Sequence, residues 1–125
     1  MGSFATATLS SMLDALARNV AYSNLTVFAQ LHLADPGAAG TTSPAANTTR
    51  QQVTCATAAA AGSIANTAAV TWTAVPSAET YVWISLWTAV TAGTFLGRDD
   101  LSAVAAVGVG DTFTIPIGSL TLSLT

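Results

Sequence analysis

The chain has 125 residues, of which only 7% are charged; it has three arginines, no lysine and a net charge of −3. We expect one domain, spanning residues 1–125, around one hydrophobic core. Neutralising phosphates takes clustered basic residues, and the three arginines are spread along the chain, which argues against a nucleic-acid partner. No apolar run reaches the roughly 18–20 residues of a membrane span, so we expect no membrane partner either.

The surface of such a chain cannot be covered with charge. A soluble monomer usually mixes charged residues over its surface and avoids apolar patches, whereas 51% of this chain is apolar. It must cover itself with Thr, Ser and Asn, or bury surface against other chains. We therefore expect a protein that works inside an assembly. Cys55 is the only cysteine, so no internal disulfide framework is expected.

Residues 8–20 are predicted to form the one helix. Apolar side chains recur there at helical spacing and form a single stripe, made by Leu9, Met12, Leu13, Leu16 and Val20. Thr8 is placed to cap the start of the helix. Asp14 and Arg18 stand four residues apart and can pair on its outer face. The stripe packs either on the sheet of the same domain, which is the commoner arrangement, or on another subunit.

The chain after residue 24 has the pattern of β structure. Residues 25–33 alternate between the two faces of a strand. Further strands are predicted at 50–56, 68–75, 80–88, 94–97, 101–107, 112–117 and 119–124, with a turn at Asp99-Asp100 between two of them. Residues 56–61 are apolar but too uniform to assign to a strand or an extended loop. Many short strands and one helix predict an antiparallel β-sandwich or a small jelly-roll-like barrel.

The strand predicted at 80–88 carries large side chains on both of its faces. Tyr81, Trp83, Ser85 and Trp87 alternate with Val82, Ile84 and Leu86. We therefore expect a central strand that is covered twice, by the opposite sheet, the helix or a neighbouring subunit. The two tryptophans are expected to be core residues, because stacking on a sugar would require them to be exposed.

Residues 34–49 form a long loop by their turn chemistry, which includes Asp35-Pro36-Gly37. The loop is uncharged after its first turn, and we take it as a candidate contact arm. Arg50 follows it and either pairs with an acid such as Asp35 or contacts a partner at the rim; both remain open. The predicted partner contacts are Asp35, Pro36, Gly37, Ser43, Pro44, Asn47 and Arg50.

His32 and Asp35 stand three residues apart, which raises the question of a catalytic site. A catalytic histidine needs a nucleophile and an orienting acid, but no G-x-S-x-G motif is present and Cys55 lies in a plain strand pattern. We expect His32 to end a strand and to hydrogen-bond a loop carbonyl. One His and one Cys cannot form a zinc site, and the aspartates lack the spacing of a calcium loop. We predict no catalytic, metal or cofactor site.

Four blocks, in order, carry a resemblance to a known family. They are MLDALARNVAY at residues 12–22; LHLADPGAAGTT at 31–42 with RQQVT at 50–54; SIANTAAVTW at 63–72 with ISLWTA at 84–89; and GDTFTIPIGSLTLSL at 110–124. On these blocks the chain resembles the small virion proteins of tailed bacteriophages described as tail-fibre-like, and some related small phage proteins decorate capsids. The chain departs from the family pattern at residues 43–46 and at Thr88, both at expected contact edges.

The resemblance implies a structural virion protein without enzymatic activity, made in the host cytoplasm. Our first expectation is a homotrimeric decoration (cement) protein on the outer capsid, which stabilises the shell by binding the major capsid protein. The alternative is a tail or tail-fibre component, which also self-associates. A third class of function, a host carbohydrate-binding module, would use Trp72, Trp83 or Trp87 as stacking platforms.

Overall fold

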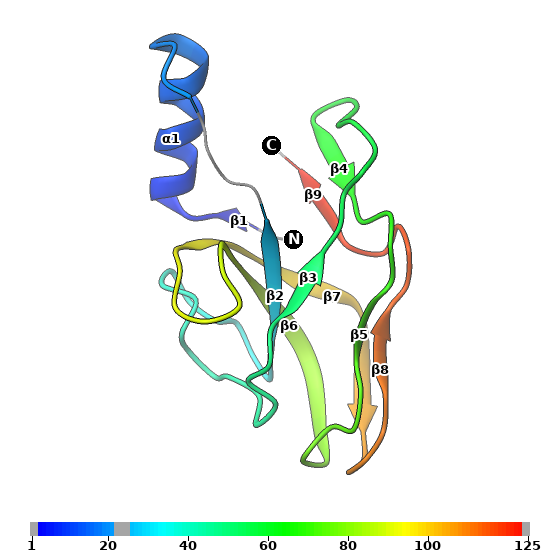
Figure 1. Ribbon diagram of the computed structural model, residues 1–125. Helices are drawn as coiled ribbons and strands as arrows, with labels where there is room; N and C mark the ends of the chain where they lie inside the picture. The colour runs from blue at the N-terminus through cyan, green and yellow to red at the C-terminus, as the bar shows by residue number, and fades with distance from the viewer. Residues whose placement is uncertain (1–2, 22–25, 124–125) are drawn as a thin grey trace.

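The computed structural model describes residues 3–21 and 26–123, and these are mainly β with one N-terminal helix, as predicted (Figure 1). The helix is α1 (Thr6–Ala17). The strands are β1 (Ser3–Phe4), β2 (Val27–His32), β3 (Gln51–Val53), β4 (Ser63–Ala65), β5 (Val70–Trp72), β6 (Glu79–Trp87), β7 (Phe95–Val107), β8 (Phe113–Ile115) and β9 (Thr121–Ser123). Each strand predicted from the sequence contains or overlaps one of these strands.

Five antiparallel strands form the main sheet in the order β1-β7-β6-β2-β3, and two further ribbons pair β5 with β8 and β4 with β9. The β5-β8 ribbon contributes Val70, Trp72 and Ile115 to one core cluster with Leu31 and Ile84 of the main sheet. An aromatic contact joins the ribbon to the main sheet, since the centre of the Phe113 ring lies 5.3 Å from that of Tyr81 in β6; within the ribbon it lies 5.8 Å from that of Trp72. The layout is sandwich-like, in agreement with the sequence pattern.

Strand β6 is central, between β7 and β2, and both of its faces are covered as expected. Ile84 and Leu86 are buried in the core cluster, while Ser85 and Trp87 are buried on the other face. Tyr81 does not share the face of Ser85 as the alternation predicted. It joins the core instead, because the pairing of β6 with β7 changes register between residues 81 and 83.

Strand β7 is one strand where the sequence predicted two. Asp99 and Asp100, expected to form a turn, lie inside β7 and pair with Ile84 and Trp83 of β6. The irregularity comes just after them: Tyr81 is paired with Ala105, although a continuous register would place residue 102 there. Such a bulge bends a strand without ending it, so the strand continues past the two acids.

The helix begins and ends earlier than predicted. It spans Thr6–Ala17 rather than 8–20, its N-cap is Ala5, and no side chain caps it. Thr8 is inside the helix and buried, so its predicted capping role is wrong. The end is set by Asn19, whose φ of 56° is left-handed. The backbone N–H of Val20 then reaches back to the carbonyl of Asp14 (3.4 Å). A left-handed residue just after the last turn is a common way to terminate a helix.

Strands β1 and β4 were not predicted, because each is short and, unlike the other short strands, does not lie inside a longer alternating segment. β1 pairs with Arg98 and Gly97 of β7. A Cβ atom at Gly97 would lie 2.6 Å from the carbonyl oxygen of Ser3, so only glycine lets β1 approach this closely. This pairing attaches the segment that leads into α1 to the main sheet.

Candidate interaction surfaces

His32, at the end of β2, makes two hydrogen bonds that tie a loop to the sheet. Its Nδ1 lies 2.8 Å from the carbonyl oxygen of Thr42, and its Nε2 lies 2.8 Å from Ser85 Oγ. Because a carbonyl oxygen only accepts, Nδ1 carries the ring proton and Nε2 accepts from the Ser85 hydroxyl. Ser85 Oγ accepts in turn from the Trp87 indole N–H at 2.7 Å. The predicted bond from His32 to a loop carbonyl is confirmed.

The Ser85–His32 pair has the distance of a nucleophile and its base but not the access. Both side chains are 0% exposed, and the group that orients the ring is a carbonyl rather than a carboxylate. Burial lowers the pKa of His32, which keeps the ring neutral at pH 7. Ser85 could not be predicted as the partner of His32, because it lies 53 residues away and is surrounded by an ordinary strand pattern.

Arg50 holds a turn against the outer face of the sheet. Its Cζ atom lies 4.0 Å from the centre of the Trp87 ring. Its Nη1 donates to the carbonyls of Ala89 (2.9 Å) and Ala92 (2.6 Å), and its Nε donates to Gln30 Oε1 (3.0 Å). A planar guanidinium can stack and donate several bonds at once. Arg50 therefore makes three hydrogen bonds and a stacking contact within its own chain.

The long loop is folded back onto the sheet. Pro36 and Asn47, two of the predicted partner contacts, are buried. Gly40 is buried beneath Phe95, and a Cβ atom there would lie 2.3 Å from a ring carbon. Ala45 is buried in the core cluster. The sequence predicted that both faces of β6 are covered but not by which element on the Ser85 face. The long loop lies on that side, where His32 bonds it to Ser85.

The remaining predicted contact residues lie nearer the surface. Asp35 does not pair with Arg50; it pairs with Arg98 of β7 at 2.8 Å and accepts the N–H of Gly37 at 2.8 Å, which forms the predicted turn. Pro44 is exposed, and Ser43 and Gly37 are half-buried. Contact of these residues with a partner stays a prediction, and Pro36 and Asn47 are packed into the chain itself.

Helix α1 divides the predicted apolar stripe between two faces. Thr8 and Met12 point toward the body of the chain and line a cleft. Leu9, Leu13 and Leu16 form a separate strip, the leucine face, whose residues are 40%, 64% and 83% exposed. Of the two arrangements left open for the stripe, packing on the same domain therefore holds for the Met12 side of the helix and not for the leucine face. Figure 1 shows why: α1 stands away from the sheet and is joined to it through β1.

An apolar cleft of about 270 Å³ lies beside α1. Its lining is drawn from six parts of the chain: Phe4, Thr8, Met12, Val27, Ala59, Gly62, Ser63, Ile64, Leu86, Leu96 and Leu122. Thr8 Oγ1 is buried there without a hydrogen-bond partner in the described part of the chain. The leucine face and this cleft lie on adjacent sides of α1, and neither carries a charged side chain.

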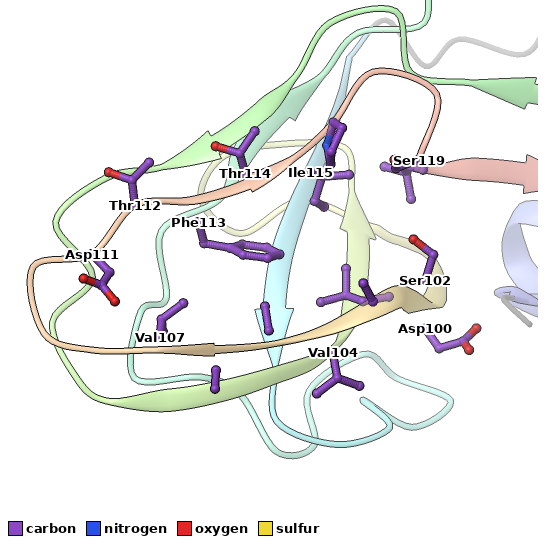
Figure 2. A pocket seen from close by; sticks show the side chains of 16 residues that line it. Asp100, Ser102, Val104, Val107, Asp111, Thr112, Phe113, Thr114, Ile115 and Ser119 are labelled. Atoms are coloured by element: carbon purple, nitrogen blue, oxygen red, sulfur yellow. The ribbon is translucent and has the colours of Figure 1, made fainter.

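A second cleft, of about 450 Å³, separates β7 from β8. It is lined by residues 100–107 and by 111–116, 119 and 120. Figure 2 shows the Phe113 ring between the two strands, with Asp100 and Asp111 near opposite ends. Within the described residues β7 pairs with β1 only at Gly97 and Arg98, and β8 pairs only with β5. The edge of β7 beyond residue 98 is therefore open.

The remaining reactive side chains do not gather into a site. Burial and the neighbouring Asp100 raise the pKa of Asp99 to about 6. Burial raises the pKa of Cys55, which packs against the core as the small apolar residue that its strand pattern predicted. Over residues 3–21 and 26–123, no three His, Cys, Asp or Glu side chains are grouped to hold a metal ion. No described helix has the length and apolar character to cross a membrane.

These features define a class of protein: a small β-rich chain whose buried polar residues fasten its own loops and whose N-terminal helix leaves an apolar face exposed. Residues 3–123 match the model of a family described as podophage GP4 fiber I protein gp80. The match covers almost the whole chain, so the chain belongs to this family. It is a structural protein of a tailed phage and a component of the virion. No curated protein matches it.

Proposed function

We propose that the chain is a fibre subunit of a podophage tail, which acts by assembly and not by catalysis. The observation that carries this proposal is the family match over residues 3–123. It favours the tail-fibre alternative over our first expectation, capsid decoration, because the family is described by a fibre. No feature of the two clefts or of the long loop favours binding to a capsid surface over binding to another fibre subunit.

The way the polar residues are used supports a non-enzymatic role. His32, Ser85 and Arg50 are polar groups gathered around β6. The first two are fully buried and bonded to each other, and Arg50 is committed to Trp87 and backbone carbonyls. A hydrolytic site needs a nucleophile that the substrate can reach. These residues instead fix the loops around β6, which gives a rigid building block.

The apolar surfaces supply the energy for assembly. The exposed fractions of the leucine face add up to nearly two whole leucine side chains. Burying a leucine fully contributes about 1.5–3 kcal/mol, so covering this face contributes roughly 3–6 kcal/mol per helix before the costs of association. Repeated contacts along a fibre multiply such a modest affinity. We therefore propose that self-association is part of the function.

The carbohydrate-binding alternative receives no support from the tryptophans. Trp72 is buried and donates its indole N–H to the carbonyl of Thr49 (2.8 Å). Trp87 is buried beneath Arg50. Trp83 is half-buried in the middle of β6. A stacking platform needs an exposed ring face, and neither Trp72 nor Trp87 offers one.

Purified virions test the proposal. Antibodies against the chain, carried on gold particles, should label the tail vertex in electron micrographs, and mass spectrometry should find far fewer copies than of the major capsid protein. An antibody against the major capsid protein serves as the control for shell labelling. Gold distributed over the whole shell, with copy numbers close to those of the capsid protein, would overturn the fibre assignment in favour of decoration.

A further inference from the structure

We propose that the cleft between β7 and β8 binds an extended segment of a different virion protein, apolar along its middle and basic at its ends. The segment would add a strand to the free strand edges that border this cleft. The proposal deepens the proposed function, because it rests on the chain being a fibre subunit that acts by assembly, and it names one surface of contact and the chemistry of its partner.

Two strands that a short turn connects border the cleft, but they do not pair with each other. The turn is closed by the N–H of Asp111, which donates to the carbonyl of Gly108 (3.1 Å), and by the N–H of Gly108, which donates to Asp111 Oδ2 (2.7 Å). Strands joined by so short a turn usually form a hairpin. Here β8 pairs with β5 and β7 pairs with β6, so within the described residues each leaves an edge along the cleft without a strand partner.

An unpaired strand edge selects its occupant more narrowly than an apolar face does. It presents backbone N–H and C=O groups in a row, and an extended peptide satisfies them by pairing as an added strand. The bulge leaves residues 101–104 of β7 without a partner residue in β6 as well. From Leu101 to Val107 the strand has no charged residue and no proline, which are two of the features that usually prevent such pairing. The edge therefore favours an extended peptide as the occupant.

Core side chains are incompletely covered on the same side of the molecule. Leu101, Val107 and Phe113 pack against the core cluster but are only partly buried, and all three line the cleft. Figure 2 shows the Phe113 ring between the two strands. The volume of about 450 Å³ lies in the range of pockets that bind ligands. Alternate side chains of an added strand point to the same face, so apolar residues at alternate positions would cover these core residues.

The charges along the cleft favour basic residues at the ends of the added strand. Asp100 and Asp111 lie near opposite ends of the cleft (Figure 2), and no basic side chain is among the described residues that line it. Complementary charges steer a partner to its site and fix its register. A second copy of this chain does not supply such a segment, because Arg18 follows a helix and Arg50 and Arg98 are bonded within their own chain. The occupant is therefore a segment of a different protein.

Binding of synthetic peptides to the full chain tests the proposal. The probe is the peptide KVTVSVTVK, blocked at both ends, and its binding is followed by the fluorescence anisotropy of an attached dye. Two matched peptides are controls: EVTVSVTVE reverses the charges at the ends, and KVTVPVTVK replaces a residue in the middle with proline, which cannot donate to a neighbouring strand. Both controls should bind at least about ten times more weakly than the probe. Equal binding of all three peptides would overturn the proposal.

Two variants of the chain locate the surface that binds the probe. Val104→Lys places a positive charge on the open edge of β7 and should weaken binding of the probe about tenfold or more. The matched control is Val90→Lys, which changes a valine of similar exposure (57%, against 61% for Val104) outside the lining of the cleft. It should bind the probe as the natural chain does. Circular dichroism should show that both variants are folded.

Hydrogen exchange of the natural chain decides the site even if Val104→Lys does not fold. The probe should slow the exchange of backbone amides in residues 101–107 and 113–115. Protection confined to other elements, or unchanged binding of the probe to Val104→Lys, overturns the proposal. A natural chain that sediments as a dimer and becomes a monomer in Val104→Lys also overturns it, because the occupant of the edge is then a second copy. Gold labelling of virions is a separate result, so a failure here leaves the fibre location standing.

Discussion

Replacing Ser85 with alanine removes one oxygen atom and breaks two buried hydrogen bonds. Ser85 Oγ donates to His32 Nε2 at 2.8 Å and accepts from the Trp87 indole N–H at 2.7 Å. In Ser85→Ala both nitrogens lose their partner while they remain buried. Each unsatisfied buried group costs about 1–3 kcal/mol, so the free energy of unfolding should fall by roughly 2–5 kcal/mol. Urea unfolding followed by tryptophan fluorescence measures this change.

The matched control is Ser102→Ala, which removes the same hydroxyl from an exposed position of β7. It should change the free energy of unfolding by less than about 0.5 kcal/mol. If Ser85→Ala were as stable as this control, the hydrogen bonds assigned to His32 and Trp87 could not be holding the loop against β6. The reasoning about the buried chain of bonds would then be refuted.

Three further predictions concern pH and packing. Burial lowers the pKa of His32 below 6.5. As the pH falls, the unfolded chain therefore takes up a proton before the folded chain does, so the stability contributed by this residue is complete above about pH 6.5 and is lost at lower pH. His32→Gln should flatten that part of the curve of unfolding free energy against pH. Asp99 acts in the opposite direction, because its pKa is raised from 3.8 to about 6 and stability is therefore lost as the pH rises through that window. Asp99→Asn should be more stable than the natural chain at pH 7. Equal or lower stability of this variant would count against the burial of Asp99. Arg50→Lys should lower the free energy of unfolding by about 1–3 kcal/mol, because an ammonium cannot both stack on Trp87 and bond three acceptors. The control Arg18→Lys, at an exposed position at the end of α1, should have little effect. Equal losses of unfolding free energy in urea would contradict the role given to Arg50.

Much of the β framework could be predicted because its strands have a clear period. In β2, Val27, Ala29 and Leu31 alternate with Phe28, Gln30 and His32, and all three face the core as predicted. The pattern fails where the register changes. A bulge after Asp100 shifts the pairing of β7 with Tyr81, and nothing local in the sequence marks a bulge whose cause is the fit between two strands.

The candidate site was harder to predict, because its contacts join residues far apart in the chain. The bond from His32 to a loop carbonyl was expected from the position of the histidine at a strand end. Ser85 was not, since it stands 53 residues away. The spacing of apolar residues in the helix does not show whether they pack on the sheet of the same domain or on another subunit. That depends on where the helix lies in the folded chain. The short strands β1 and β4 gave no period at all.

The long loop between β2 and β3 alternates between residues that anchor it and residues that it displays. Pro36, Gly40, Ala45 and Asn47 are buried, whereas residues 38, 39, 41, 42, 44, 46 and 48 are exposed. The anchors fix the path of the backbone, so the displayed positions can change their side chains without changing that path. The loop thus works as a fixed frame for a variable surface. A new binding preference could arise on it by substitution, with the fold of the sheet beneath left as it is.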